Sequence, residues 1–336
     1  ERAKEIDDFK PEEFWTIAAQ LLAAKDEFET QLIKIGDAKL EKFSIKTQED
    51  ADKIVSNLDN ASWQVLKIEK KESKRQPLPP FTTSTLQQTA WSWFGFGAKQ
   101  TMLLAQQLYE TGLITYMRTD SLNLSKDSVS AAYEKIKKDF GKNYLPATPR
   151  IYKTKSKTAQ EAHEAIRPTA PEKDPEMLKG KLAPQQFKLY DLIWKRFIAS
   201  QMSGAIFEAT GVDVLAKNIN DTWTFRATGN VLKFDGFLRA YPQKLSENSL
   251  PLLKEKEDLE LKELKPAQHF TEPPPYYNEA SLIKVLEEYG IGRPSTYAPT
   301  LATIQTRRYV IKDEDKRLKP TDIGILVNTL LVKHFP

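Results

Sequence analysis

The sequence predicts a multi-domain α+β protein. Its 336 residues suit about two domains of ~150 residues each. Hydrophobic residues make up 40% and charged residues 29% of the chain, which is typical of folded globular proteins and excludes fibrous and disordered classes. Two blocks with β-strand signals flank a block with helical signals, and this order predicts one domain inserted into another.

The first β-rich block follows a short helical pattern around Ile6 and Phe9. Runs of aromatic and β-branched residues predict strands at 14–17, 28–35 and 63–68, with a turn at Gly36-Asp37. Ile54 and Leu58 lie four residues apart behind an acidic start, which predicts a helix between the later strands. The basic stretch 70–80 ends in Pro-Leu-Pro-Pro, and we expect it to be a linker.

The helical block runs from about 81 to 203. Ser84 is expected to cap a helix over 85–93, and the Gly95-Phe96-Gly97 turn precedes a helix over 98–111. Ser125 is expected to cap a further helix that ends at Gly141. Strand signals then return at 212–215, 223–227 and 231–237 and continue to Leu264. The triple proline 273–275 opens the last region.

The last region resembles the helical block internally. Segments 95–101 and 290–296 share the spacing G-x-G-x-x-x-T, and each lies between two helical patterns. Each second helix leads into a β-prone run, at 113–117 and at 309–311. Helix, turn, helix and strand is the outline of a winged helix-turn-helix, so the sequence predicts two such units.

Composition excludes several classes of site. The chain has no Cys and three His, so disulfide scaffolds, zinc ribbons and Cys nucleophiles are excluded within it. No apolar run approaches the ~18 residues of a membrane span, and the charged start is unlike a signal peptide, so we expect a cytoplasmic protein with no membrane partner. The absence of an initial Met and the apolar run at the end suggest a piece of a longer protein.

Local charge favours nucleic acid more than the net charge of +4 does. Segment 289–312 carries Arg293, Arg307, Arg308 and Lys312 and no acidic residue. Segment 150–157 carries four basic residues around Tyr152. Basic side chains interleaved with aromatic and small polar ones suit a phosphate backbone with bases that can stack.

The run 112–121 could hold a nucleophile. Tyr116 is expected at the end of a strand, just before a turn formed by Asp120 and Ser121. A phenol with its ordinary pKa of ~10 needs a cation to favour the phenolate and to stabilise charge at phosphorus. Arg118 would lie on the same face of the strand and could serve as that cation.

Three motifs give a more specific indication. Thr115-Tyr-Met-Arg-Thr-Asp-Ser121, Ala159-Gln-Glu-Ala-His-Glu-Ala-Ile-Arg-Pro-Thr169 and Gly290-Ile-Gly-Arg-Pro-Ser-Thr-Tyr297 together resemble the signature of type IA DNA topoisomerases of the bacterial topoisomerase I kind. Phe81-Thr-Thr-Ser-Thr-Leu-Gln-Gln88 and Pro11-Glu-Glu-Phe-Trp15 agree with it. The resemblance covers essentially the whole chain, in order.

The resemblance implies roles for several residues. Tyr116 matches the nucleophile that forms a transient 5′-phosphotyrosine, while Arg118 and His163 match active-site residues that also contact DNA. Arg293, Thr296 and Arg307 match further DNA-binding positions. Arg167 would share a helical face with His163 before Pro168 ends that helix, which makes it another candidate for DNA contact.

The resemblance also implies an architecture, a toroidal gate. Residues 14–80 and 204–272 would form a β-rich arch, 81–203 an inserted helical domain with Tyr116, 273–336 a helical base with a winged-helix-like unit, and 1–13 the end of a base helix. The Tyr domain would swing about the connections 75–80 and 201–204.

The family holds Mg²⁺ on an N-terminal Toprim domain with a D-x-D-x-E pattern, and this chain would begin after that domain. Asp313-Glu-Asp315 is expected at a hairpin tip and not in a metal site. The C-terminal zinc modules of the family would also be missing. We therefore predict no metal site and no bound cofactor in this chain, and a Toprim partner within the same parent chain.

The implied substrates are single-stranded and negatively supercoiled DNA, in the nucleoid. The resealing of the strand needs no nucleotide, which agrees with the lack of a G-x-x-x-x-G-K-[ST] loop. The alternative is a non-enzymatic protein with two winged helices, in which Tyr116 only stacks on bases. A Tyr-based recombinase or nuclease fits the order of the motifs less well.

Overall fold

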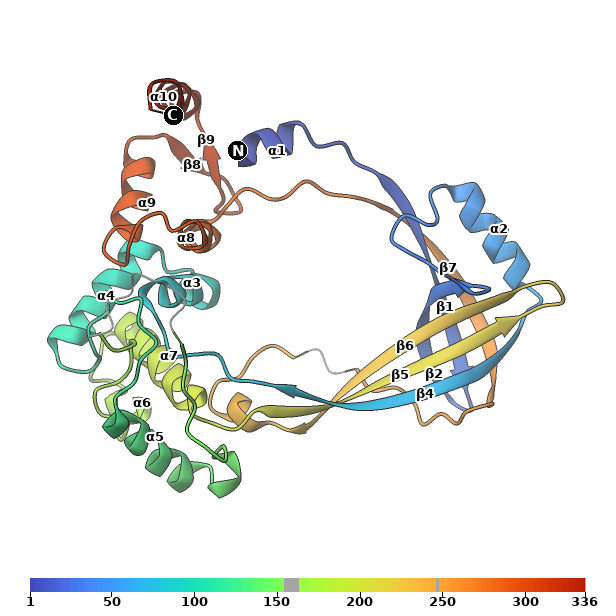
Figure 1. Cartoon of the computed structure of the whole chain (residues 1–336), viewed down its shortest axis with the longest axis horizontal. Helices are drawn as coiled ribbons and strands as arrows, with labels where there is room; N and C mark the ends of the chain where they lie inside the picture. The colour runs from blue at the N-terminus through green and yellow to red at the C-terminus, as the bar shows by residue number, and fades with distance from the viewer. Residues whose placement is uncertain (154–162, 246–247, 336) are drawn as a thin grey trace.

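The computed structural model describes residues 1–153, 163–245 and 248–335. The molecule is a ring around a central opening, with most helices on one side and a β-sheet on the other (Figure 1). A three-stranded ribbon joins the two sides along one edge, and the extended chain 271–278 joins them along the other. This arrangement confirms the predicted α+β class.

The sheet side is a closed antiparallel barrel. Its strands are β1 (Glu13–Ala23), β2 (Asp26–Ile35), β3 (Ala38–Lys39), β4 (Ser62–Arg75), β5 (Ala205–Lys217), β6 (Thr222–Phe234) and β7 (Asp258–Phe270). The order is β1-β7-β4-β5-β6-β2-β3, and β1 also pairs with β2. Because β1 contacts both β7 and β2, six strands close on themselves and leave few exposed edges.

Alternation along the strands fills the barrel. In β1, Ile17, Ala19 and Leu21 point inward and are buried, as the period of two requires. They pack with Trp63 and Phe225, whose ring centroids lie 4.8 Å apart. The helix α2 (Gln48–Leu58) begins after Thr47, whose side chain accepts a hydrogen bond from the Asp50 N–H, and buries Leu58 in the same core. The strands predicted at 14–17, 28–35, 63–68 and 212–215 and the helix are confirmed, whereas 223–227 and 231–237 belong to one strand, β6, which ends at Phe234.

The predicted linker at 70–80 is wrong for its first half. Residues 70–75 continue β4 and pair with β5, from Lys70 opposite Thr210 to Arg75 opposite Ala205. Their charged side chains hide the strand from a reading of hydrophobic periodicity, since the ladder here is held by backbone hydrogen bonds. Residues 208–211 of β5 contain no buried side chain, although Phe207 and Val212 on either side belong to two separate cores. The ribbon β4–β5–β6 is therefore a thinly packed neck (Figure 1).

The other side of the ring is helical. It contains α3 (Thr83–Phe94), α4 (Ala98–Glu110), α5 (Lys126–Asp139), α6 (Pro175–Leu178), α7 (Pro184–Ser200) and the short 3₁₀ turns η1 (Lys142–Tyr144) and η2 (Gly236–Arg239). Ser125 caps α5 as predicted. Thr82, not Ser84, caps α3. In this capping box the side chains of Thr82 and Thr85 each accept a hydrogen bond from the backbone N–H of the other. Leu86, Leu108 and Leu189 lie in the core between these helices.

The ribbon enters the helical side at a crowded crossing. Gly236 has a φ of +49°, and a Cβ there would overlap the carbonyl group of Gly204. The buried Arg196 of α7 donates from Nε to the carbonyl oxygen of Pro79 at 2.7 Å, and its guanidinium lies 4.7 Å from the centre of the Phe81 ring. The root of the ribbon is thus fixed to the helices.

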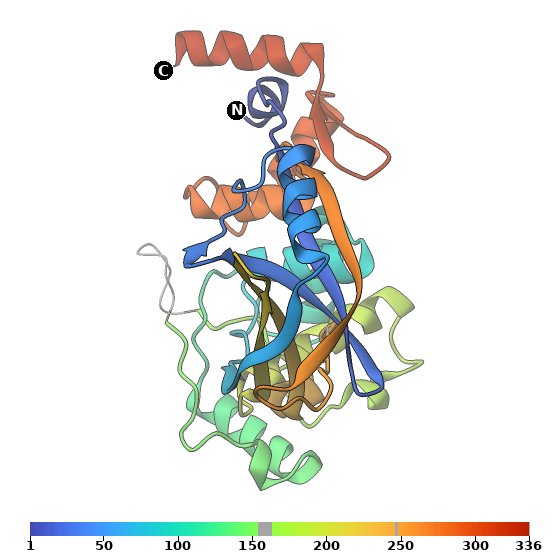
Figure 2. The same cartoon turned by 90° about the vertical axis from the view of Figure 1, so that its right-hand side faces the viewer.

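The last region is a winged helix-turn-helix followed by a helix. It consists of α8 (Glu279–Glu288), α9 (Tyr297–Thr306), the hairpin β8 (Val310–Lys312) and β9 (Leu318–Pro320), and α10 (Asp322–His334). Figure 2 shows α10 at one end of the molecule, away from the barrel. Nearby, Arg2 of α1 (Arg2–Asp7) donates to the Tyr277 hydroxyl at 2.7 Å.

The predicted similarity between the two helix-turn-helix units is confirmed for their helices, but only the second unit has a wing. The helices α3 and α4 repeat α8 and α9, but the residues after α4 form no hairpin. The proposed domain boundaries remain a prediction. No helix within the described residues combines the length and apolar character needed to cross a bilayer.

Candidate active site

The segment that carries Tyr116 is suspended between two supports. The first is the start of α3, where the Thr83 hydroxyl donates to the carbonyl oxygen of Met117 at 2.7 Å and accepts from the Thr119 N–H at 2.8 Å. The second is the extended segment 163–168. Thr115 donates its N–H to the Arg167 carbonyl oxygen at 2.9 Å, and its hydroxyl donates to the carbonyl oxygen of Ala165 at 2.7 Å.

The prediction of a strand at 113–117 is wrong. The run forms a single bridge, between Ile114 and Pro168, and threonine hydroxyl groups supplement its few backbone hydrogen bonds to 165–169. Burial nevertheless alternates along it, because Met117 and Thr119 are buried while Tyr116 and Arg118 are exposed. The two candidate catalytic side chains therefore point outward together, although no strand places them.

The Tyr116 side chain is 40% exposed, and its ring contacts two other rings. The ring centroid of Tyr109 from α4 is 5.3 Å away and that of His163 is 6.2 Å away, both edge-on. His163 is half-buried and belongs to the extended segment 163–168. The helix expected from His163 to Arg167 is therefore wrong, and the two residues share no helical face. The structure brings Tyr116 and His163 together by packing 113–117 against 163–168.

Arg118 lines a pocket of about 220 Å³ between the two helix-turn-helix units. One wall consists of Arg118 with Lys99 and Met102 of α4, and the other of the start of α9 and the residues before it, including Pro294 and Ser295. Two cations and no carboxylate line this pocket. Lys99 and Arg118 give this largely apolar pocket a positive charge, which favours an anion beside them. The pocket also places Arg118 next to the Gly-Arg-Pro-Ser-Thr segment.

Arg293 and Thr296 shape that segment. The Thr296 hydroxyl accepts from the Arg293 N–H at 2.8 Å, and Arg293 donates from Nη1 to the carbonyl oxygen of Gly292 at 2.7 Å. Gly292 has a φ of +82°, which favours glycine. Both Arg293 and Thr296 are exposed beside the pocket wall. Arg307 is also exposed but lies at the far end of α9, ~15 Å along the helix from Thr296.

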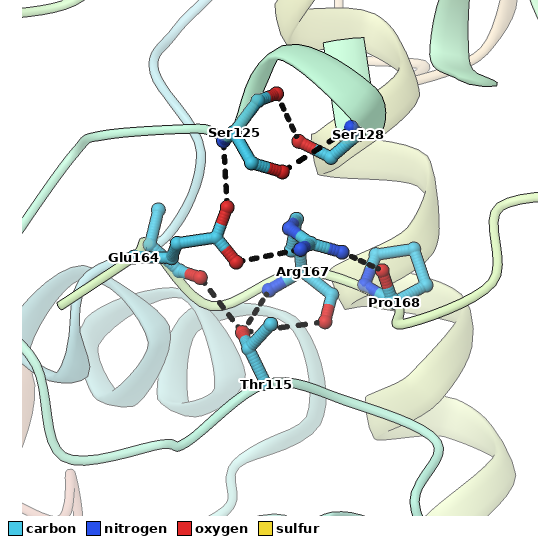
Figure 3. A network of polar contacts seen from close by, with 7 residues as sticks. Thr115, Ser125, Ser128, Glu164, Arg167 and Pro168 are labelled. Carbon is cyan, nitrogen blue, oxygen red and sulfur yellow. Dashed lines mark hydrogen bonds and ion pairs between the residues drawn. The ribbon is translucent and has the colours of Figure 1, made fainter. Parts of the chain in front are cut away.

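Arg167 does not face open solvent. Its side chain is 12% exposed, pairs with Glu164 at 2.5 Å and donates from Nη1 to the Pro168 carbonyl oxygen at 3.0 Å (Figure 3). Burial alone would raise the pKa of Glu164, but hydrogen bonds from Arg167 and from the Ser125 N–H outweigh it and hold that pKa below its ordinary value. This network stiffens the segment behind Thr115, so Arg167 supports the site from within.

The predicted basic stretch 150–157 lies only partly within the described residues, since 154–157 fall outside them. Arg150 donates from Nε to the carbonyl oxygen of Met202, and the Tyr152 hydroxyl donates to that of Ser200, both at 2.7 Å. These two side chains fasten their segment to the end of α7, so they are not free for base stacking or phosphate.

Acidic groups do not assemble a metal site in the described part of the chain, where no three potential ligands cluster. At the hairpin tip, the Asp313 carboxylate accepts the Arg317 N–H at 2.8 Å and lies 3.7 Å from Lys319. Sequence reasoning missed Lys99 and Tyr109. Lys99 lies inside the G-x-G-x-x-x-T motif, which was interpreted only as a turn between helices. Nothing in the sequence around Tyr109 marks it as a site residue, apart from its place in a helical pattern.

Comparisons with known proteins identify the family of the chain. The family model described as DNA topoisomerase matches residues 1–336. The DNA topoisomerase 1 of Rickettsia bellii is 49% identical over 100% of this chain, and that of Xylella fastidiosa is 43% identical over 100%; the chain spans 43% of each protein. The structure of full-length topoisomerase I from Thermotoga maritima matches with a TM-score of 0.82 and 33% identity, over 99% of this chain and 53% of that one. The chain belongs to the type IA DNA topoisomerase family.

Proposed function

We propose that the chain is the tyrosine-bearing gate of a type IA DNA topoisomerase, which cleaves one DNA strand, passes another strand through the gap and reseals it. The proposal rests mainly on the exposed Tyr116 ring beside His163, with Arg118 pointing outward two residues later into a cation-lined pocket. This arrangement provides a nucleophile, a proton donor and an anion site within one short segment.

The reaction follows from these groups. The Tyr116 oxygen attacks phosphorus, an O–P bond forms to the tyrosine, and the bond from phosphorus to the 3′ oxygen breaks, giving a 5′-phosphotyrosine and a free 3′ hydroxyl. Arg118 stabilises the added negative charge at phosphorus. The Tyr116 hydroxyl loses its proton as the new bond forms, and His163 passes a proton to the leaving 3′ oxygen, so the protons balance. One phosphate ester replaces another, so the reverse attack reseals the strand without ATP and allows negatively supercoiled DNA to relax.

A second surface supports single-stranded DNA as the substrate. A groove of about 720 Å³ runs along α3 and is lined by Gln88, Trp93, Arg196 and Lys244, among others, with no acidic residue. Trp93 is 42% exposed and stacks on Tyr241 at 4.9 Å. A partly exposed indole beside the exposed Lys244 suits unpaired bases and phosphates, whereas the buried Arg196 keeps its contact with Pro79. We place the protein with its DNA in the bacterial cytoplasm, at the nucleoid.

The family implies Mg²⁺ and a Toprim domain of the same parent chain. Among the described residues no acidic cluster fits a metal site for that ion. We infer that the Toprim domain and its Mg²⁺ form the wall of the active site that faces Tyr116. We also infer that this chain alone binds DNA without cleaving it. Without that wall, Tyr116 lacks the environment that makes a phenol reactive.

The test is Tyr116→Phe in the complete parent protein, with Tyr109→Phe as the matched control on the neighbouring ring. After denaturation, labelled single-stranded DNA should remain covalently bound to the wild type and to Tyr109→Phe, and not to Tyr116→Phe. Affinity for DNA should stay within a few fold, since one hydroxyl contributes little binding surface. Adducts in Tyr116→Phe would refute the assignment, and no adduct in the wild type would favour the non-enzymatic alternative.

A further inference from the structure

The ring has one junction, within the described residues, that no covalent chain crosses. From the helical side the chain runs through the ribbon into the barrel, and from β7 it returns through 271–278 to α8. The ring is closed where α3 packs against α8 and α4 packs against α9. A DNA strand can enter the opening from the side only if the α3–α8 and α4–α9 contacts separate, because every other connection around the ring is continuous polypeptide.

The apolar part of this junction is small. It buries Ala98 of α4 against Ile283 of α8 and against Tyr297, Ala298 and Leu301 of α9. At its edge the Ser84 hydroxyl donates to Glu287 at 2.7 Å. The Arg118 pocket lies across the same junction, so its two walls meet only while the junction is closed.

One buried charge lies within the junction. Glu279, at the start of α8, is 5% exposed, and its Oε2 accepts the Ala98 N–H at 2.7 Å. Ala98 is the first residue of α4, and Gly97 before it has no side chain to cap the helix. A Cβ at Gly97 would lie 3.1 Å from that carboxylate oxygen, so the second glycine of Gly95-Phe-Gly97 leaves room for Glu279. A carboxylate at a helix N-terminus is favoured by the helix dipole.

The same carboxylate also holds the wing. Its Oε1 accepts from Lys312 Nζ of β8 at 2.6 Å. Lys312 and Glu279 lie on one side of the junction, whereas Ala98 lies on the other. When the junction parts, Glu279 keeps Lys312 and loses the N–H group of Ala98.

We propose that Glu279 is the latch of the ring, a positioning residue that caps α4 from the opposite unit and so sets Arg118 against the Pro294–Ser295 wall. This proposal rests on the strand-passage function, because only a ring that opens needs a latch. The hydrogen bond from the Ala98 N–H to the Glu279 carboxylate can form in only one alignment of the two units. When the ring closes again, this bond therefore restores the same Arg118 pocket. Replacement of Glu279 should favour the open ring without removing any group that is proposed to touch DNA.

The absence of Cys makes the test direct, because two introduced cysteines can be spin-labelled without background. Lys138→Cys on α5 and Glu314→Cys at the hairpin tip place labels on exposed residues on either side of the junction. The distance between the labels is measured by pulsed electron resonance on the 336-residue chain without DNA. Glu279→Gln should raise the ratio of long to short distances at least tenfold, the scale of losing one charged hydrogen bond. Glu288→Gln, at an exposed residue of the same helix, should leave the ratio unchanged.

Glu279→Ala and Lys312→Met extend the series. The alanine variant should open the ring at least as much as Glu279→Gln. Lys312→Met removes the cation that lies 5.3 Å from the centre of the Trp91 ring of α3 across the junction, but it leaves Glu279 in place and should change the ratio less. Unchanged distances in both Glu279 variants would overturn the proposal, and so would a lowered melting temperature with unchanged distances, which would show a packing role alone. The measurement involves no cleavage, so failure of the tyrosine chemistry and failure of the latch are distinguishable.

Discussion

At the scale of single residues, exposure separates the candidate catalytic groups from those that support them. Tyr116 and Arg118 reach solvent, whereas Met117 and Thr119 between and after them are buried. The sequence predicted the shared direction of Tyr116 and Arg118 from a strand, and the actual cause is anchoring by threonine hydroxyl groups. The local sequence pattern therefore predicts correctly that both side chains point to solvent. The groups that anchor the segment, Thr83 and Ala165, are distant in sequence and could not be predicted from it.

Arg118→Ala should slow strand cleavage in the parent protein by on the order of 10²-fold, the usual scale for the loss of one group that stabilises charge at the transition state. Its side chain is exposed, so the fold should be unaffected. Single-turnover adduct formation measures the rate, and Arg226→Ala on the barrel is the control, because that guanidinium pairs with Asp213. An unchanged rate would assign Arg118 a structural role.

Tyr152 should make stability fall at alkaline pH. Burial raises its pKa to about 12, and Arg150 and Arg196 only partly oppose this. Because the folded pKa lies above the ordinary value of ~10, the stabilisation is complete below pH ~10 and is lost as the pH rises toward 12. Tyr152→Phe should flatten the decline in melting temperature between pH 10 and 12, whereas Tyr289→Phe, at a residue that is 73% exposed, should not. Parallel curves for the wild type and Tyr152→Phe would contradict this.

At the scale of elements, hydrophobic periodicity predicted the strands and helices that bury one face in a core. The strands of the barrel and the capped helices α2 and α5 follow from alternation, spacing and Thr or Ser caps. Residues 70–75 could not be recognised as strand, since every one of their side chains is exposed and no apolar alternation marks them. The wing expected after α4 is missing because residues 113–117 pair with 165–169 instead, a contact that no local pattern encodes.

Gly236→Ala should lower the free energy of unfolding by about 3 kcal/mol or more. The residue has a positive φ, and a Cβ would overlap backbone atoms of Ser203 and Gly204, which cannot move without separating the ribbon from the helices. Gly211→Ala is the matched control, since no atom lies within 4 Å of a Cβ there and the residue is in a strand. Urea denaturation compares the two, and equal midpoints would show that the crossing tolerates a shift.

At the scale of the whole molecule, the buried charges lie where the ring is attached and where it closes. Among the described residues, Arg196 and Glu279 are the charged side chains in the buried class. Arg196 holds the root of the ribbon to α7, and Glu279 joins the two helix-turn-helix units. Between the two cores, the thin neck at 208–211 is the part of the ribbon with least packing to resist bending. We therefore expect the neck, and not the connections at 75–80 and 201–204, to bend when the ring opens.

The charge of the whole molecule also leads to a prediction about DNA binding. A net charge of +4 spread over 336 residues gives little attraction, so affinity must come from local cations. Arg118 and Arg293 lie near the pocket, and Arg307 lies a helix length away, farther than neighbouring phosphates are apart. A strand that contacts all three must therefore run along α9.

Binding of single-stranded DNA to this chain should weaken with salt at a log-log slope of roughly −2 to −3, because three or four phosphates at ~0.7 each are neutralised. Arg307→Ala should reduce the slope by about 0.7 without changing base preference, since an exposed arginine at the end of α9 offers charge to the backbone. Fluorescence anisotropy with a labelled oligonucleotide at several salt concentrations measures both slopes, with Arg226→Ala as the control. An unchanged slope in Arg307→Ala would place the strand elsewhere than along α9.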